Sequence, residues 1–169
     1  MIAHVLDRVR HQTSGPIAIN ANLTEEYARL EHEVICDKVW EKAGPLAGIR
    51  TAMVWASGKG AANVLTLAVD VPFFPRDLLQ KLRAVGTPAI ATAGDRWHPV
   101  NGLWQADQIA SLDAYLEQGK RSVHGWAERC GANLANFGQV NPSADAFWNV
   151  NTPTDMAKAE QMLAALKSQ

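Results

Sequence analysis

The sequence predicts an α/β fold, an open and mostly parallel β-sheet with helices on both faces. Segments with helical spacing of apolar residues alternate with short apolar runs typical of strands. The most strand-like run, residues 63–69 (NVLTLAV), is almost continuously apolar, which is typical of a parallel strand covered on both faces. No stretch is rich enough in Pro, Gly or Ser to be a linker, so we expect one domain over residues 1–169.

The first part of the chain shows this alternation clearly. Gly15-Pro16 and Gly44-Pro45 each separate one element from the next, and Pro45 suits the first turn of a helix. Thr24 is a candidate N-cap. In chain order we expect a helix at 2–9, a strand at 17–20, a helix at 24–30, a strand at 33–37 and a helix from Pro45.

The alternation continues after residue 63 and loosens after residue 95. Gly119 and Gly131 are typical of helix ends, and Pro153 is typical of a helix start. Segment 96–105 (RWHPVNGLWQ) reads as a short hairpin or paired strands. We also expect a strand at 63–69, a helix from Pro75 to about Val85, a strand at 88–92, helices near 107–118 and 122–130, strands at 132–137 and 147–150, and a closing helix from Pro153 to about Leu166.

Composition limits the function classes. The formal net charge of −1 offers no basic field, so neither nucleic acid nor an anionic membrane is an expected partner. Cys36 and Cys130 lack CxxC spacing, which argues against a disulfide framework or a zinc site and fits a reducing cytoplasm. No apolar run approaches the roughly 18 residues of a membrane span, and the N-terminus lacks a signal-peptide layout.

Polar residues stand where the predicted strands end. Asp70 follows the strongest strand directly, Asn20 and Asn22 follow the strand at 17–20, and Asp37 ends the strand at 33–37. In an open α/β sheet the ligand binds beyond the carboxyl ends of the strands. Carboxylate and amide oxygens there suit Mg²⁺ together with a phosphate-bearing ligand. The alternative for each residue is a structural one, the capping of a strand or turn.

Seven segments stand out together, in this order along the chain: NAN (20–22), CD (36–37), GPLAGI (44–49), LAVDVPFFPRDLL (67–79), HPV (98–100), GKRSV (119–123) and FWNVNTPTDMAKAE (147–160). In their order and spacing they resemble the molybdenum cofactor guanylyltransferases over essentially the whole chain. That resemblance implies a three-layer, Rossmann-like nucleotidyltransferase fold. It also implies transfer of GMP from GTP to the terminal phosphate of molybdopterin, with release of pyrophosphate and a requirement for Mg²⁺. Molybdoenzymes or their chaperones, and other cofactor-biosynthesis proteins, are further implied partners.

The resemblance assigns residues 1–92 to a nucleotide-binding half. Asp70 matches the aspartate that coordinates Mg²⁺, where a cation would neutralise charge on the attacked phosphorus. Asp37 matches an acid near the guanine and ribose pocket. The implied nucleotide-binding residues are Asn20, Asn22, Asp37, Gly44, Pro45, Leu46 and Gly48. For the GPLAG segment, the alternative is a purely structural helix entry.

Residues 93–169 are the implied pterin-binding half. Asn149 and Asn151 are two apart in an expected strand, so both side chains would point to one face and could hydrogen-bond a heterocycle. Arg121 matches a basic position that meets a phosphate or the pterin, and His98 matches an HP segment near the site. A structural role is the alternative for His98, and Thr152 reads best as an N-cap before Pro153.

The family pattern begins with a strand and a glycine-rich loop of the form LAGGxSxRMGxDK, which these 169 residues do not contain. We therefore expect an unpaired groove beside the neighbouring strands and no such phosphate cradle. A start codon placed too far downstream, a truncation and a divergent protein without catalysis all remain open. The alternative functions are a non-catalytic molybdopterin-binding or delivery module, and a related cytidylyl- or sugar-phosphate nucleotidyltransferase.

Overall fold

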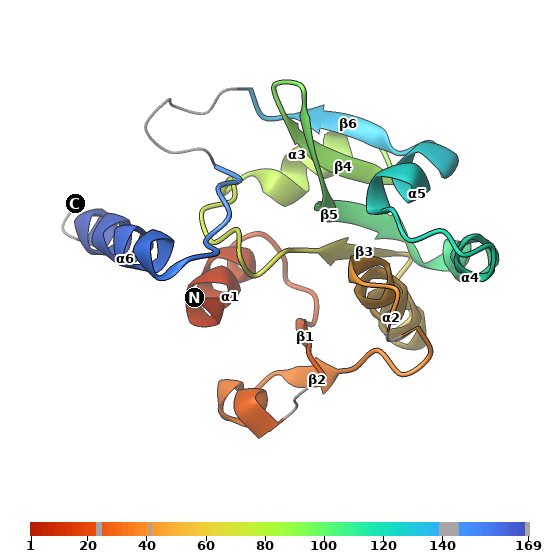
Figure 1. The fold of residues 1–169 in the computed structure, drawn as a ribbon, viewed down its shortest axis with the longest axis horizontal. Helices are drawn as coiled ribbons and strands as arrows, with labels where there is room; N and C mark the ends of the chain where they lie inside the picture. Colours follow the sequence, from red (N-terminus) through yellow and green to blue (C-terminus); the bar gives the residue numbers. More distant parts are fainter. Residues whose placement is uncertain (23–24, 41, 139–145, 168–169) are drawn as a thin grey trace.

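The structure is a computed structural model that describes all residues except 23–24, 41, 139–145 and 168–169. A central mixed sheet is flanked by helices (Figure 1). The helices are α1 (Ile2–Arg10), α2 (Pro45–Gly58), α3 (Leu78–Ala84), α4 (Ile109–Glu117), α5 (Val123–Arg129) and α6 (Pro153–Lys167), with 3₁₀ turns η1 (Glu25–Leu30) and η2 (Ala106–Gln108). The strands are β1 (Ala18–Asn20), β2 (Glu33–Ile35), β3 (Asn63–Thr66), β4 (Ala89–Ala93), β5 (Arg96–Gln105) and β6 (Asn133–Asn136).

The main sheet has the strand order β3-β5-β4-β6. Strand β5 runs antiparallel to both β3 and β4, whereas β4 and β6 are parallel, so β3, β4 and β6 share one direction. The predicted α/β class is confirmed, but the expectation of a mostly parallel sheet is wrong for the main sheet, in which two of the three strand pairings are antiparallel. The reason is β5: residues 96–105 form one strand of ten residues that pairs on both edges.

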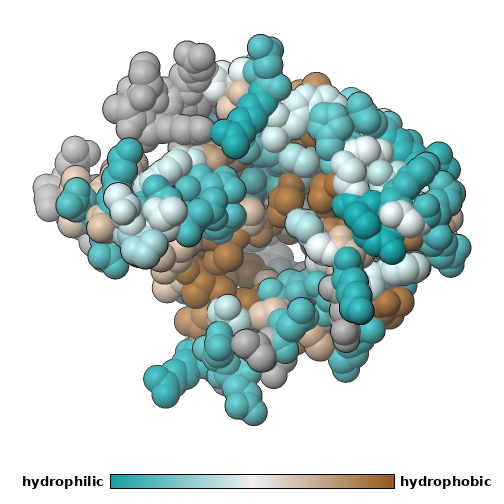
Figure 2. Space-filling view, in the orientation of Figure 1, coloured by the Kyte–Doolittle hydropathy of each residue, from teal (hydrophilic) through white to brown (hydrophobic). Residues whose placement is uncertain are grey.

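Strands β1 and β2 form a separate parallel pair. Between β1 and β3 lies a cavity of about 980 Å³, visible as a hollow with hydrophobic walls in Figure 2. Its lining includes Val5 and Val9 of α1, Ile19 of β1, Ile49 of α2 and Val64 of β3. No backbone ladder joins β1 to β3 in the described ranges, so the groove that the resemblance predicted is present.

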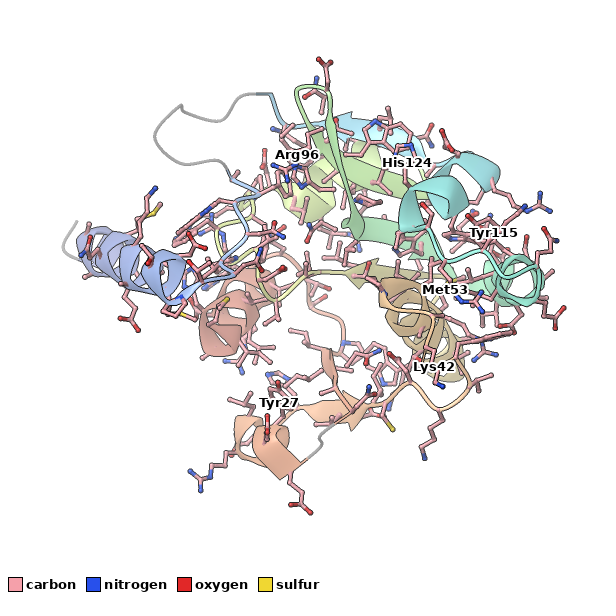
Figure 3. The ribbon with its side chains drawn as sticks, in the orientation of Figure 1. Tyr27, Lys42, Met53, Arg96, Tyr115 and His124 are labelled. Carbon is pink, nitrogen blue, oxygen red and sulfur yellow. The ribbon has the colours of Figure 1, made fainter. Side chains whose placement is uncertain are left out.

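Two apolar clusters lie on opposite sides of the main sheet. One joins α2, α4 and α5 to β3 and β5, and the other joins α1 and α3 to β4 and β6. Helix α2 shows why the sequence folds this way, because Leu46, Ile49 and Met53 recur at helical spacing and all three are fully buried. Met53 is labelled in Figure 3. In the described part of the chain, no helix has the length and apolarity needed to span a membrane.

Some expected elements differ from the structure. Strand β3 ends at Thr66 rather than at residue 69, and the helix expected at 24–30 is a 3₁₀ helix over Glu25–Leu30. The expected strand at 147–150 is wrong: the segment forms a turn followed by irregular backbone. Its aromatic residues, which favour strands, are instead used in ring stacking. The N-cap prediction for Thr24 lies outside the described residues.

Candidate functional site

Asp70 lies in the segment that leaves β3, and it is half-buried. Its carboxylate Oδ2 accepts a hydrogen bond from Asn149 Nδ2 at 3.1 Å, and its backbone oxygen accepts one from Val150 N at 2.8 Å. The structure therefore brings the acid predicted to bind a metal against an asparagine predicted to bind the pterin.

Helix α1 holds the loop that follows Asp70. Arg8 donates from Nε to the backbone oxygen of Phe74 and from Nη2 to that of Phe73 at 3.4 Å. Burial lowers the pKa of the Arg8 guanidinium, and Arg76 lowers it further. Gln12 donates to Pro75 O at 3.0 Å and accepts from Leu79 N at 3.0 Å. The sequence did not single out Arg8 or Gln12, because nothing in their local pattern signals backbone oxygens 66 and 63 residues further along the chain.

The segment before Asn149 is anchored by aromatic rings. Trp148 stacks on Phe73 with ring centroids 6.2 Å apart and an interplanar angle of 12°. Phe147 stacks on His98 at 4.5 Å, and His98 is only 8 % exposed. The sequence predicted His98 near the site, and the structure places it in β5 beneath the segment that carries Asn149.

A second polar group lies where β1 and β2 end. Asn20 Nδ2 donates to Asp37 Oδ1 at 2.8 Å and approaches Gly48 O at 3.4 Å. A Cβ atom on Gly48 would lie 3.3 Å from Asn20 Nδ2, so a larger residue there would require the Asn20 amide to shift by a few tenths of an ångström. The structure thus brings together Asn20, Asp37 and Gly48, three of the predicted nucleotide-binding residues.

The remaining predicted nucleotide residues flank this group. Gly44 has φ +60° and directly precedes Pro45 at the first turn of α2, so the backbone turns sharply here. Leu46 is fully buried in the apolar cluster, which leaves its backbone as the part that could meet a ligand. Asn22 is exposed. The large cavity is lined by Asn20 and Gly48 on one wall and by Val69, the neighbour of Asp70, on another. Tyr27, labelled in Figure 3, lines it from η1.

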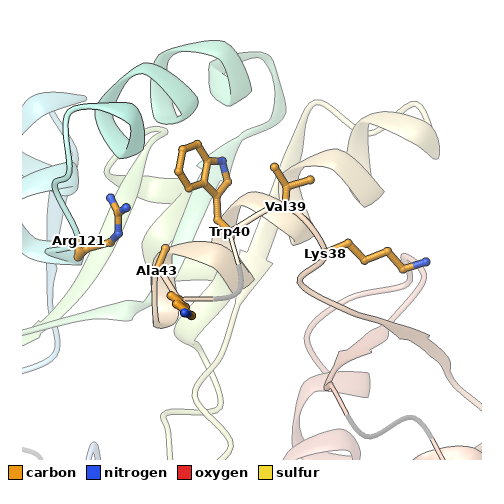
Figure 4. Close-up of a pocket in the computed structure, with 6 residues that line it drawn as sticks. Lys38, Val39, Trp40, Ala43 and Arg121 are labelled. Carbon is orange, nitrogen blue, oxygen red and sulfur yellow. The ribbon is translucent and has the colours of Figure 1, made fainter.

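Arg121 lies elsewhere, in the loop between α4 and α5. Its Nη1 donates to Leu116 O at 2.7 Å and to Lys120 O at 2.8 Å, and its guanidinium lies 5.5 Å from the Trp40 ring centroid. Arg121 and Trp40 line a pocket of about 380 Å³ together with Lys38 and Lys42. The Lys38 side chain extends away from the Arg121 side of this pocket (Figure 4). Among the contacts of the described residues, none joins Arg121 to Asp70 or Asn149.

Asn151 and Thr152 lie at the start of α6. Asp155 Oδ2 accepts from Asn151 N at 3.3 Å and from Thr152 Oγ1 at 2.8 Å, while Asp155 N donates to Thr152 Oγ1 at 3.1 Å. This reciprocal pattern is a capping box, so the N-cap prediction for Thr152 is confirmed. The hydrogen bond from the Thr152 side chain is the main reason why the pKa of Asp155 is lowered.

The donor set around Asp70 fits a magnesium ion that shares its coordination with phosphate and water. The described residues contain no group of three or more His, Cys, Asp or Glu able to hold a metal. Mg²⁺ keeps several waters and is commonly bound through one or two carboxylates plus substrate phosphates. One half-buried carboxylate oriented by an amide is consistent with that mode, whereas a cage built only of protein ligands is not.

Comparison with known proteins adds three matches. A family model described as MobA-like NTP transferase domain matches residues 1–130. The chain is 40% identical to a protein of Rhizobium leguminosarum bv. trifolii named molybdenum cofactor guanylyltransferase, over 99% of this chain and 82% of that protein. It is 38% identical to a Cereibacter sphaeroides protein of the same name, over 96% of this chain and 82% of that protein.

Solved structures share the fold. The crystal structure of molybdopterin-guanine dinucleotide biosynthesis protein A from Archaeoglobus fulgidus matches with a TM-score of 0.67 and 21% identity, over 95% of this chain and 86% of that chain. A putative protein from Aquifex aeolicus matches with a TM-score of 0.69 and 19% identity, over 88% of this chain and 79% of that chain. At such identities the likeness concerns the fold.

Proposed function

Because this chain belongs to the MobA-like NTP transferase domain family and to the molybdenum cofactor guanylyltransferases, we propose that it transfers GMP from GTP to the molybdenum-molybdopterin cofactor. A terminal phosphate oxygen of molybdopterin attacks the α-phosphorus of GTP. The bond from that phosphorus to the bridging oxygen breaks, and the bridging oxygen leaves with pyrophosphate. The product is the guanine dinucleotide form of the cofactor, made in a single displacement.

The contact between Asp70 and Asn149 is the observation that supports this proposal best. A dinucleotide-forming enzyme must bring two phosphate-bearing substrates to one point. Asp70, the proposed metal-binding residue, accepts a hydrogen bond at 3.1 Å from Asn149, a predicted pterin-side residue. Arg8 of α1 and Gln12, which follows α1, hold the loop behind this point, so the carboxylate is presented from a fixed backbone.

Mg²⁺ is the proposed cofactor, and Asp70 is the residue that would hold it. When bound, it would neutralise charge on the phosphates and on the attacked phosphorus. The protein's part is to orient the reactants. Asp70 would hold the cation, Asn149 orients the Asp70 carboxylate by its hydrogen bond, and Asn20, Asp37 and the start of α2 form the proposed nucleotide wall. Asn151, Arg121 and His98 stay predicted pterin-side residues.

Replacing Asp70 with asparagine tests the proposal. The purified chain is incubated with GTP, MgCl₂ and molybdopterin, and pyrophosphate and guanylylated cofactor are quantified. We expect Asp70→Asn to lower the initial rate by about 100-fold or more, because an uncharged amide holds Mg²⁺ and its phosphates weakly. The control is Asp95→Asn, which removes an exposed carboxylate in the turn between β4 and β5 and should leave the rate unchanged.

Other outcomes would contradict the proposal. Molybdopterin binding without turnover would assign a binding or delivery role. A clear preference for CTP, or transfer to a sugar phosphate, would assign a different nucleotidyltransferase. Equal activity of the wild type and Asp70→Asn would remove Asp70 from the mechanism.

A further inference from the structure

The ladder between β3 and β5 ends just before the segment that carries Asp70. The last paired residues are Thr66 of β3 and Gly102 of β5. In the same register Ala106 N donates to Ala62 O at 2.8 Å, so these two residues form a hydrogen-bonded pair. Hydrogen-bonded pairs alternate with non-bonded pairs along an antiparallel ladder. Counted from Ala62 and Ala106 in steps of two, residues 68 and 100 are the next pair that a longer ladder would bond.

Two side chains take the backbone groups that this further pair would join. Thr66 Oγ1 donates to Val100 O at 2.7 Å, and Asn101 Oδ1 accepts from Ala68 N at 3.1 Å. Asn101 is a buried polar residue, only 2 % exposed. The chain can therefore leave the sheet after Thr66 while Ala68 N and Val100 O both keep a hydrogen-bond partner.

A bulge in β5 contains Asn101. Between Ile90 and Ala91 of β4 the register with β5 shifts, and residues 99–101 of β5 have no partner in β4. Bulges re-aim side chains and are common beside active sites. In this bulge the amide oxygen of Asn101 is aimed at the segment that leaves β3.

Ala68 is the first residue of the turn that presents Asp70. Val71 N donates to Ala68 O at 3.2 Å, so residues 68–71 form a turn in which Asp70 is the third residue. The hydrogen bond from Ala68 N to Asn101 ties the start of this turn to a strand of the main sheet.

We infer that Asn101 is a positioning residue for Asp70. Its amide oxygen sets the point at which the chain leaves β3, and this sets where the Asp70 carboxylate stands relative to a bound cation. Asn101 acts through the backbone of the turn rather than by contact with the cation or a substrate. The inference rests on the proposed function, in which Asp70 holds Mg²⁺, and goes beyond it by extending the metal site to a buried residue of β5.

Metal binding measures the effect. Mn²⁺ replaces Mg²⁺ as a paramagnetic probe, and its Kd in the presence of GTP is measured by electron paramagnetic resonance for the wild type and Asn101→Leu. Leucine has nearly the shape of asparagine but no hydrogen-bond acceptor. Asn101→Leu should raise the Kd for Mn²⁺ by about 10-fold, a size typical for loss of a group that orients a metal-ligating carboxylate.

Thr92→Val is the matched control. It removes a buried hydroxyl from β4 in the same sheet, one that donates to Ala135 O at 3.4 Å. It should bind Mn²⁺ as the wild type does, because this hydrogen bond does not involve the turn at residues 68–71. A similar loss of Mn²⁺ affinity in Thr92→Val and Asn101→Leu would overturn the inference, since the loss would then follow the removal of any buried polar group.

Hydrogen exchange in the wild type tests the contact without any variant. The Ala68 amide lies beyond the last ladder pair, and in the wild type it should exchange about as slowly as the β3 amides that bond to β5, as measured by NMR. In Asn101→Leu the same amide should exchange much faster. Fast exchange of the Ala68 amide in the wild type would overturn the inference, even if Asn101→Leu failed to fold.

The outcomes separate this inference from the proposed function. Equal Mn²⁺ affinity of Asn101→Leu and the wild type would overturn the inference and leave the proposed function untouched. Binding of Mn²⁺ and GTP by the wild type without release of pyrophosphate from GTP and molybdopterin would contradict the proposed function and leave the inference standing. A wild type that binds no Mn²⁺ in the presence of GTP would overturn both.

Discussion

Asp70 and Asn149 are 79 positions apart in the chain, and their side chains meet at 3.1 Å. The neighbours of Asn149 explain how its position is fixed. Trp148 stacks on Phe73, and Val150 is buried and bonds to the backbone oxygen of Asp70. Asn149 is itself exposed, so its amide orients a carboxylate rather than filling the core. Groups that orient a ligating carboxylate affect metal affinity even when they do not touch the metal.

Replacing Asn149 with alanine should therefore weaken Mg²⁺-dependent GTP binding by about 10-fold, a size typical for loss of such an orienting group. The melting temperature should hardly change, because an exposed hydrogen bond contributes little to stability. Calorimetric titration with GTP at several MgCl₂ concentrations measures the effect. Asn133→Ala, which removes a side-chain amide from β6, is the control and should show the same MgCl₂ dependence as the wild type. Equal MgCl₂ dependence in Asn149→Ala and the wild type would show that the amide does not orient Asp70.

For individual residues, the sequence singled out candidate side chains but not the contacts between them. The end of an apolar run was enough to single out Asp70, and the pairing of Thr152 with Pro153 was enough to predict a helix cap. The contact between Asp70 and Asn149 could not be predicted, because it joins two irregular segments that have no shared periodicity. Arg8 and Gln12 were also missed, because the local sequence pattern around them does not reveal which distant backbone oxygens their side chains meet.

Helices α2 and α4 are joined by a polar link on one face of the sheet. Arg50 of α2 donates to Asp113 of α4 from Nη2 at 2.9 Å and from Nε, and Trp40 donates to the same carboxylate at 3.0 Å. The Arg50 hydrogen bonds, and then the one from Trp40, lower the pKa of Asp113 against the opposing effect of burial. The link holds the start of α2, and with it the turn at Gly44 and Pro45, against α4.

This link should contribute to stability in a pH-dependent way. Because the folded-state pKa of Asp113 is depressed, its contribution is present above the unfolded value of about 4 and is lost as the pH falls through the folded value. Asp113→Asn should lower the free energy of unfolding by about 1–2 kcal/mol at pH 7, allowing for partial exposure. Urea unfolding from pH 7 to pH 2.5 measures the difference between variant and wild type, which should shrink below about pH 4.

Asp95→Asn serves as the control for that experiment, since it removes an exposed carboxylate in the β4–β5 turn. A difference between Asp113→Asn and the wild type that stays constant down to the lowest pH would contradict the assignment. It would mean that the carboxylate contributes through its shape rather than through its charge.

Elements were predictable where their signals are local. Helix α2 begins at the predicted proline, and α6 begins at Pro153, because both starts depend on backbone chemistry within one turn. The length of β3 and the irregular path of 147–150 depend on partners elsewhere. Strand directions also could not be read from apolar runs. The antiparallel pairing of β5, which makes the sheet mixed, was therefore not predicted.

In the whole molecule, the pair β1–β2 stands apart from the four-stranded sheet. The cavity of about 980 Å³ between β1 and β3 is lined largely by apolar side chains, and both strands have an unpaired edge facing it in the described structure. The groove was predicted from the resemblance, and its apolar lining was visible only in the structure. Unpaired edges of this kind favour association between chains.

The chain of 169 residues should therefore self-associate as its concentration rises. Sedimentation velocity between about 5 and 100 µM measures this, with 1-anilinonaphthalene-8-sulfonate fluorescence reporting the apolar groove. Ala18→Lys, which places a charge on the β1 wall of the cavity, should reduce the association. A compact monomer over the whole concentration range would contradict the expectation.

The same arrangement has a consequence for how the molecule opens. Strand β4 is hydrogen-bonded on both sides, by β5 and β6, whereas β1 has one partner and only three residues. In hydrogen–deuterium exchange the amides of β4 should be among the slowest in the chain. The amides of β1 and β2 should exchange through a separate local unfolding with a lower free energy of opening. The strand ends that carry Asn20 and Asp37 would then belong to the less stable of two cooperative units, so a ligand bound there would slow exchange in β1 and β2 first.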